Sequence, residues 1–523
     1  MRVSKIYMVL LAMAFIGFSC TDDFDEINTN PLALTADKVD ASLIGLSFAR
    51  AVHRGMYGAG VGGGGYQISQ NLFADIYCQY FALTHPNFPS DRYVQVGRWS
   101  DSAWRSFFGD GAASIDFVEK FTAENSLTTQ NAVAKIWKVY AFHRMTDFWG
   151  PIPYSQFGNG ELSVPYDQQE DIYRSFFVTL DEAVAALKAN PSGSAFGPND
   201  LIYNGDATKW VTFASSLRLR LAMRVRYADA GLAKSEAEKA VAEGVIMANE
   251  DNAFVKTTAA SFNPLNQITG WGEFRMSTLM ESVLKGYGDP RIGIYFQPAA
   301  DGDTDGDGIP YEGLRNGQSQ VQLTDSKNAN HSDVAEYFRP GNIPNNPPIP
   351  VMRAGEVFLL RAEGALQGWN MGGSTQELYE QGIRMSMQEW GAADDAAIDA
   401  YIASSNTPVD ASPESPAVSD IPIAFEAGGS EERQLEQIAT QKWLALYPDG
   451  WEGWAEVRRT GYPKQFSRLN SENLDVGPDE LMRKMKFESS EFDNKREAVE
   501  AAIASPEIGG NDKNSTRLWW DKK

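Results

Sequence analysis

Apolar side chains at helical spacing constrain the fold of this chain more than any other feature. Residues 131–147 carry them three or four positions apart, at Val133, Ile136, Trp137 and Tyr140. This spacing places them on one face of an α-helix. Residues 167–187 and 434–446 show the same amphipathic pattern. The sequence therefore predicts a mainly α protein.

Polar residues mark where several of these helices begin and end. Asp206 is a good N-cap for a helix that continues to Leu221. Residues 356–367 form a second candidate helix that stops at a glycine, and Ser374 to Glu377 form a capping box that opens another. The last two helices together have about the length of a tetratricopeptide-type hairpin. We therefore expect tetratricopeptide-like helical hairpins.

Regions between the helices predict an irregular, loop-rich subdomain with small β hairpins. Residues 291–296 and 321–324 have the composition of short strands on either side of an Asp/Gly loop. The stretch 404–430 is rich in Pro, Ser and Ala and is predicted to be a surface excursion. Arg218, Arg220 and Arg224 lie on one predicted helix, where they are either solvated or paired.

The first residues have the pattern of a bacterial lipoprotein signal. Arg2 and Lys5 precede an uncharged, mostly apolar run over residues 6–18, which is too short to span a bilayer. Cys20 follows at once, and the chain then becomes polar. We predict a signal peptide over 1–19, lipid on Cys20, a tether over 20–35 and a single helical domain over 36–523. An ordinary secretory signal with an incidental cysteine is the alternative.

The charge of the chain excludes some classes of partner. Removal of the leader takes away Arg2 and Lys5 and changes the net charge from −23 to −25. Nucleic acids bind basic surfaces, so no nucleic-acid partner is expected. Contact with the membrane is expected only through the lipid anchor. With Cys20 lipidated, Cys78 has no disulfide partner.

The strongest chemical motif is an acidic loop that satisfies the calcium-loop pattern of EF-hands. Calcium takes six to eight hard oxygen ligands, and the pattern supplies them through side chains at positions 1, 3 and 5, a carbonyl at position 7 and a bidentate glutamate at position 12. The matching residues are Asp301, Asp303, Asp305, Asp307 and Glu312. The flanking segments do not have helical patterns, so a metal-free acidic turn remains the alternative to a Ca²⁺ site.

Aromatic residues follow a glycine-rich tract and supply candidate ligand contacts. Flat rings can stack on sugar C–H surfaces, and arginine can bond hydroxyl groups. The candidates are Arg92, Tyr93, Trp99 and Trp104, with Tyr311 and Arg315 beside the acidic loop as a second group. Packing in the core is the alternative for each ring.

Known catalytic motifs do not occur in the sequence. It has no GxSxG, HExxH or CxxC pattern, and its four histidines are scattered. A glycosidase needs only two carboxylates that the fold brings together, so a surface hydrolase remains an alternative to a binding protein. A purely structural surface protein is a third class. We expect no catalytic activity.

Several motifs, in their order along the chain, resemble the SusD/RagB family of outer-membrane lipoproteins, in the branch described as starch-binding and associating with the outer membrane. They are residues 24–31, the tryptophan corner 147–155, and the segments 205–221, 362–387 and 441–463. The resemblance implies tetratricopeptide-type hairpins with an irregular second part. It implies capture of oligosaccharides, or of peptides, for a SusC-like TonB-dependent transporter. It also implies a lipid-anchored position at the outer membrane, exposed on the cell surface.

Overall fold

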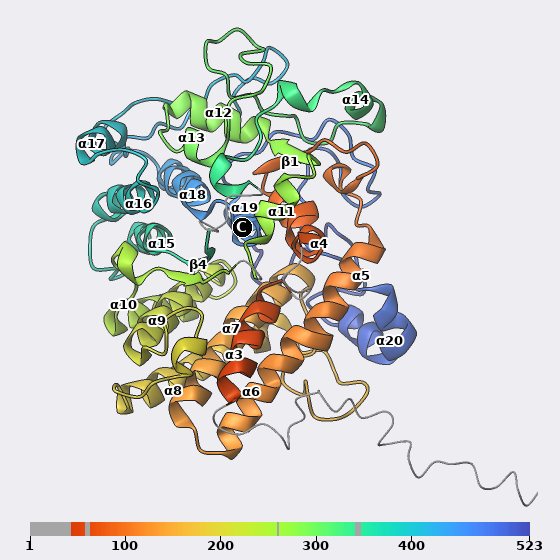
Figure 1. The fold of residues 1–523 in the computed structure, drawn as a ribbon, viewed down its shortest axis with the longest axis vertical. Helices are drawn as coiled ribbons and strands as arrows, with labels where there is room; N and C mark the ends of the chain where they lie inside the picture. Colours follow the sequence, from red (N-terminus) through yellow and green to blue (C-terminus); the bar gives the residue numbers. More distant parts are fainter. Residues whose placement is uncertain (1–42, 58–62, 259–260, 340–346) are drawn as a thin grey trace, which may run out of the picture. The chain divides into compact units, whose positions relative to one another are not determined.

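Helices make up most of the chain in the computed structural model (Figure 1). The structure describes residues 43–57, 63–258, 261–339 and 347–523. The predicted signal peptide, Cys20 and the tether lie outside these residues, so the divisions at residues 20 and 36 stay predictions. Leu46–Lys523 forms one compact unit. None of the described helices is both long and apolar enough to cross a membrane.

The first part of this unit is a series of helices that pack on their neighbours in sequence. In α7, α9 and the helices around them, each helix packs on the next, so that they form consecutive hairpins. The elements up to α10 are α3 (Ile44–Tyr57), α4 (Gly63–Tyr66), η2 (Gln67–Asp75), β1 (Phe81–Leu83), η3 (Ser90–Arg92), α5 (Gly97–Ser106), η4 (Phe107–Ala112), α6 (Ala113–Glu124), α7 (Thr128–Trp149), α8 (Gln169–Ala189), η5 (Gly197–Asn199), α9 (Ala207–Arg224) and α10 (Ala230–Glu243).

The middle part is more irregular and carries the short strands. Its elements are η6 (Asn249–Asp251), β2 (Ala253–Val255), α11 (Pro264–Thr269), β3 (Phe274–Met276), α12 (Thr278–Tyr287), α13 (Ile292–Tyr295), α14 (Gln320–Asp325), η7 (Asn328–Asn330), η8 (Glu336–Phe338) and β4 (Ile349–Met352). This region corresponds to the predicted loop-rich subdomain.

The last part returns to helical packing. Helix α15 packs on both α16 and α18, and α18 packs on α19, as their neighbouring positions in Figure 1 also show. The elements are α15 (Ala354–Leu366), α16 (Thr375–Trp390), α17 (Asp395–Ile402), α18 (Glu431–Leu446), α19 (Gly450–Thr460) and α20 (Ser489–Ala504). The predicted class, mainly α with tetratricopeptide-like hairpins, is confirmed.

The predicted caps form as expected. The Asp206 carboxylate accepts hydrogen bonds from the backbone N–H groups of Thr208 and Lys209 at the start of α9. Ser374 and Glu377 form the capping box of α16. These contacts satisfy N–H groups that have no partner inside the helix. They are local, which is why the sequence pattern identifies them.

The strand predictions were wrong in position and in connection. Residues 291–296 contain α13, and residues 321–324 lie within α14. Ser319 caps α14 with a capping box that the prediction did not use. The strands that do form are antiparallel pairs of distant segments, β1 with β3 and β2 with β4, rather than hairpins. Pairing over such separations depends on tertiary contacts.

The stretch 404–430, which the sequence predicts to be a surface excursion, contains no helix or strand and is bound to the neighbouring helices. Its backbone carbonyls at Ile421 and Ile423 accept hydrogen bonds from the hydroxyls of Tyr287 and Tyr379 at 3.1 and 2.7 Å. The Val409 N–H donates to the Ser282 carbonyl on α12 at 3.1 Å. The side chains of both isoleucines are fully buried. The excursion therefore packs as a strap over α12 and α16.

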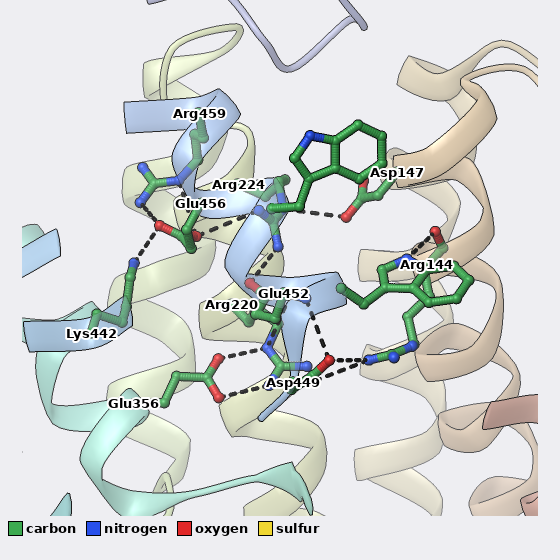
Figure 2. Close-up of polar contacts among 12 residues, drawn as sticks. Arg144, Asp147, Arg220, Arg224, Glu356, Lys442, Asp449, Glu452, Glu456 and Arg459 are labelled. Atoms are coloured by element: carbon green, nitrogen blue, oxygen red, sulfur yellow. Dashed lines mark hydrogen bonds and ion pairs between the residues drawn. The ribbon is translucent and has the colours of Figure 1, made fainter. Parts of the chain in front are cut away.

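A buried network of charges joins the helical hairpins (Figure 2). Arg220 on α9 forms a two-pronged pair with Glu356 on α15, at 2.6 and 2.7 Å. Arg224, one turn further along α9, pairs with Glu452 on α19 and lies 3.3 Å from the Asp147 carboxylate on α7. All five side chains are almost completely buried. The arginines of α9 are therefore paired rather than solvated, because they face other helices.

The same network continues through α18 and α19. Lys442 and Arg459 both bind the Glu456 carboxylate, at 2.6 and 2.7 Å. Arg459 also holds both oxygens of Glu363 at 2.6 Å, and Arg226 reaches that carboxylate at 3.0 Å. Buried charges are tolerated only when they are paired and hydrogen-bonded, so these contacts fix how the helices dock.

Candidate functional site

Three of the predicted ligand residues, Arg92, Tyr93 and Trp104, are buried. Arg92 donates from Nε to Glu472 at 2.5 Å and from Nη1 to the Gln318 carbonyl at 3.2 Å. The Tyr93 hydroxyl donates to the Glu480 carbonyl at 2.8 Å. Trp104 packs against the rings of Phe108, Trp149 and Tyr166 and is about 1% exposed. None of the three presents a free face to a ligand in this structure.

Burial has a clear physical cause at each of these rings. The Arg468 guanidinium covers Tyr93, 4.1 Å from the ring centroid. Burial also raises the pKa of the Tyr93 hydroxyl. Trp104 lies 4.5 Å from Phe108 and 5.3 Å from Trp149, measured between ring centroids. Trp149 and Tyr154 of the tryptophan corner are themselves buried, so this corner is packed.

Trp99 differs, because it is only half-buried at the start of α5. Phe88 meets its ring edge-on, with centroids 5.3 Å apart, and His85 stacks on Phe88 at 4.4 Å. The Arg98 guanidinium lies 5.6 Å from the Trp99 ring centroid. We call His85, Phe88, Arg98 and Trp99 the surface aromatic group. Spacing along the chain did not single out His85 or Phe88 as ligand contacts.

The chain that follows the second predicted group packs against the chain around Arg92. Tyr311 is half-buried. Arg315 donates hydrogen bonds to Ser415 Oγ at 3.0 Å and to the Ser467 carbonyl at 2.7 Å. The residues that follow them contact the segment just before Arg92: Asn316 donates to Asp91 at 2.8 Å and Gln320 donates to Asn87 at 2.9 Å. Two segments more than 200 residues apart in the sequence therefore pack against each other.

An open groove of about 370 Å³ lies beside the start of α5. Its lining includes Val94, Gln95 and Gly97, which precede Trp99, together with residues 472–474 and 486–489. Leu474 is fully exposed there. Glu488 also belongs to the lining and is buried, and its carboxylate accepts from Trp149 Nε1 at 3.0 Å and Ser100 Oγ at 2.9 Å. Burial raises the pKa of Glu488 to about 8.

The acidic loop gathers its carboxylates around a lysine. Lys285 on α12 is buried, and its Nζ lies 3.2 Å from Asp305, 3.0 Å from Asp307 and 3.6 Å from Glu312. It also pairs with Glu281, one turn earlier on α12, at 2.9 Å. The ammonium thus occupies the middle of the carboxylates. Neither Lys285 nor Glu281 is visible in the loop motif, because both come from another element.

The predicted metal ligands divide into two groups. Asp303, Asp305 and Asp307 bring oxygens within 4.8 Å of one another at the exposed tip. Asp305 and Glu312 also come within that distance of Glu281. Asp301 is exposed and belongs to neither group. These two acidic groups can hold a metal ion, in an arrangement that differs from the EF-hand set.

The turns of this loop explain its shape. Asp303 accepts from the N–H groups of Gly306 and Gly308, at 2.7 and 2.8 Å, and Asp307 accepts from Ile309 at 2.7 Å. Gly302, Gly306 and Gly308 all have positive φ, which only glycine adopts at low cost. The Asp/Gly alternation therefore specifies a tight acidic turn with or without a metal.

Comparison with known proteins places this fold in a family. Residues 26–521 match the sequence profile described as "SusD-like: Susd and RagB outer membrane lipoprotein". The chain belongs to the SusD-like family. Members of this family are non-catalytic binding lipoproteins of the outer membrane, which agrees with the predicted location and class. Among proteins with curated descriptions, none matches this sequence.

Solved SusD-like structures superpose on nearly the whole chain. A chitin-binding SusD homolog from Flavobacterium johnsoniae is 34% identical with a TM-score of 0.82, covering 91% of this chain and 98% of its own. A SusD homolog from Bacteroides vulgatus ATCC 8482 is 33% identical with a TM-score of 0.81, covering 90% and 97%. A SusD homolog from Bacteroides uniformis ATCC 8492 is 32% identical with a TM-score of 0.81, covering 93% and 100%.

Proposed function

We propose that this SusD-like protein captures oligosaccharides at the cell surface and delivers them to a SusC-like TonB-dependent transporter. The observation that carries the proposal is the surface aromatic group beside the open groove. Trp99 is half-buried and Arg98 is exposed, so a ring and a hydrogen-bond donor face the same surface. Such a pair suits a sugar, whose C–H faces stack on rings and whose hydroxyls accept hydrogen bonds.

Chitin oligosaccharides are the first ligands to test. A structural relative 34% identical over nearly the whole chain is described as chitin-binding. Another relative described as a chitin-binding protein is 27% identical, with a TM-score of 0.76 over 91% of this chain and 100% of its own. These likenesses support an acetamido sugar as the ligand of the surface aromatic group.

The variant Trp99→Ala tests the capture site. Loss of the stacking ring should weaken binding of chitin oligosaccharides about tenfold in isothermal titration calorimetry. Trp369→Ala is the matched control, because Trp369 is also half-buried but lies between α15 and α16. Equal affinity of the Trp99 variant and the wild type would remove this surface from the proposal. If the protein binds peptides but no glycan, the proposed ligand class changes from oligosaccharide to peptide.

The transporter and the anchor can be tested in the native membrane. We expect a TonB-dependent transporter to copurify with the protein from outer membrane in mild detergent. Cys20→Ser should release the protein from the membrane fraction, because one thiol carries the proposed lipid. A protein that purifies without a transporter would contradict the proposed partnership. A Cys20→Ser variant that stays membrane-bound would contradict the proposed lipid anchor.

We also propose that the exposed tip of the acidic loop binds calcium. Asp303, Asp305 and Asp307 supply hard oxygens, and Lys285 neutralises only part of the negative charge around them. Calcium titration of the wild type should give binding heat that Asp303→Ala loses. The same heat from both proteins would leave the tip as a metal-free turn.

A further inference from the structure

The first turn of α5, which carries Trp99, is tied to a buried glutamate from the far end of the chain. Helix α5 begins without a side-chain cap, since Val96 occupies its N-cap position. Glu488 stands at the N-cap of α20 and is 2% exposed. Its Oε2 lies 2.9 Å from Ser100 Oγ in the first turn of α5, and its Oε1 accepts from Trp149 Nε1 at 3.0 Å. Three segments therefore meet at this one side chain.

Gln95 joins the same arrangement from the other side of the helix start. Its Nε2 donates to Glu488 Oε1 at 3.3 Å and to Ser100 Oγ at 3.2 Å. Glu488 thus contacts residues on both sides of the point where α5 begins. Trp99 lies between them, and its N–H donates to the Val96 carbonyl at 2.8 Å within the same turn. The position of the Trp99 ring therefore depends on how this turn is held.

The surroundings of Glu488 favour a neutral carboxyl group over a carboxylate. Lys484 lies near it but pairs with Asp512, and no cation forms an ion pair with Glu488 in the part of the chain that the structure describes. Asp101 on α5 adds a like charge, which Arg105 balances at 2.8 Å. Burial, with a smaller contribution from Asp101, raises the pKa of Glu488 to about 8, against its hydrogen bonds and Lys484. A buried carboxylate without a counter-ion is disfavoured, so the proton is retained at neutral pH.

Ser100 gives the proton of Glu488 a defined place. A serine hydroxyl both donates and accepts, so at 2.9 Å a protonated Oε2 can donate to Ser100 Oγ. That hydroxyl can then donate to the Gly97 carbonyl, 3.4 Å away. Oε1 still accepts from Trp149 and Gln95. Both oxygens of the neutral group are thus used, and one of them extends the hydrogen bonding to the first residue of α5.

The other charged and titratable groups near Glu488 have partners of their own. The Tyr166 hydroxyl donates to Glu491 on α20 at 2.5 Å. Burial raises the pKa of Tyr166, so it stays neutral as the pH rises. Lys486, which lines the same groove, pairs with Asp475. None of these three contacts replaces the hydrogen bonds that Glu488 makes to α5.

We propose that Glu488, as a neutral carboxyl group, positions the first turn of α5 and so holds Trp99 in the surface aromatic group. The consequence for capture rests on the proposed function of Trp99, whereas the anchoring of α5 follows from the hydrogen bonds. Glu488 lines the open groove, so an ionised carboxylate can reach water there by giving up Ser100 and Trp149.

The direction of the pH effect follows from the raised pKa. The folded pKa of Glu488, about 8, lies above its ordinary value of 4.5. The contribution of Glu488 to the folded arrangement is therefore complete below pH 4.5 and is lost as the pH rises through 8. Capture of a sugar on Trp99 should weaken in the upper part of that range.

The pH profile of affinity for chitin oligosaccharides tests this role in the whole mature protein. In the wild type, we expect Kd to rise about fivefold between pH 7 and about pH 9.5. Glu488→Gln keeps the size, an acceptor for Trp149 and a donor for Ser100, but it does not titrate. It should bind as the wild type does at pH 7 and lose most of the pH dependence. Glu497→Gln, on the exposed face of α20, is the matched control and should keep the wild-type profile.

Hydrogen exchange of residues 95–106 measures the anchoring of α5 without a ligand. After correction for the intrinsic exchange rate, protection should fall above about pH 8 in the wild type and stay constant in Glu488→Gln. A wild-type affinity that does not change with pH, or equal protection in both proteins at every pH, would overturn the positioning role. If protection falls as expected but no chitin oligosaccharide binds either protein, the proposed function fails and the anchoring of α5 by Glu488 stands.

Discussion

The buried charge network and the acidic loop both pair carboxylates with cations, but the ratio of cations to carboxylates differs between them. In the network, Arg459, Arg226 and Lys442 all face Glu363, at 2.6, 3.0 and 3.4 Å. In the loop, one ammonium, that of Lys285, faces four carboxylates. The network lies on helices that hold each partner in place, whereas the loop supplies three of its four carboxylates from turns.

The pKa values of two buried glutamates reflect this difference in the number of nearby cations. Burial alone would raise the pKa of Glu363, but Arg459 and Lys442 outweigh it and hold that pKa near 2. Burial raises the pKa of Glu281 to about 7: a single cation, Lys285, and the Gly313 N–H oppose the rise, and Glu312 adds to it. The number of cations around a carboxylate, more than its depth, decides whether it is ionised near neutral pH.

Removal of a network carboxylate should have the largest effect on stability. Glu363→Gln leaves Arg459 and its neighbours buried with too few counter-charges. We expect it to lower the free energy of unfolding by about 3–5 kcal/mol. Denaturant unfolding would measure this. Glu497→Gln, on the exposed face of α20, is the control and should cost less than about 0.5 kcal/mol. Equal losses would show that the network adds no more than surface charges do.

Removal of the loop's one cation should have a smaller effect, which calcium reverses. Lys285→Met leaves Glu281 and Glu312 facing each other, and we expect a loss of about 2–3 kcal/mol in the free energy of unfolding. A divalent ion can take the place of the ammonium, so added calcium should raise the Tm of this variant more than that of the wild type. The same calcium shift in both proteins would contradict the view of Lys285 as a built-in cation.

The pH dependence of stability should show the smallest and most specific effect. The folded pKa of Glu281, near 7, lies above its ordinary value of 4.5. Its contribution to stability is therefore complete below pH 4.5 and is lost as the pH rises through 7. Glu363 has a lowered pKa, so its contribution is present above pH 4.5 and is lost as the pH falls toward 2.

Glu281→Gln isolates the first of these two windows. Glutamine does not titrate, so the fall in stability between pH 4.5 and 7 should shrink by about 1–2 kcal/mol. Urea unfolding at several pH values would measure the change. The acid window below pH 4.5 should remain, since it depends on Glu363. A variant whose profile matches the wild type at every pH would refute the assignment.

Local patterns predicted much of the helical structure of this chain. Helix α7 contains the predicted segment 131–147, and Asp206 and Ser374 cap the helices that they were expected to cap. Helix formation and capping depend on contacts within a few residues, so the sequence carries them directly. Strand pairing does not have this property, and β1 and β3 find each other across nearly 200 residues.

The predicted ligand residues show the same contrast between local and long-range effects. Trp99 and Trp104 have the same type of ring five positions apart, yet Trp104 is enclosed by Phe108 and Trp149 while Trp99 stays half-exposed. Only distant packing decides which ring faces solvent. The order of motifs, by contrast, was enough to place the chain in its family, because those residues build the helices and corners that its members share.

The sequence alone determined the mainly helical class, the caps, the family and the Asp/Gly turn, since each depends on neighbouring residues or on a recurring order of motifs. Tertiary structure alone decided that the arginines of α9 are buried and paired, that Lys285 lies among the loop's carboxylates, and that Glu488 joins the start of α5 to the tryptophan corner. The physical reason is that burial and ion pairing depend on side chains that arrive from distant parts of the chain.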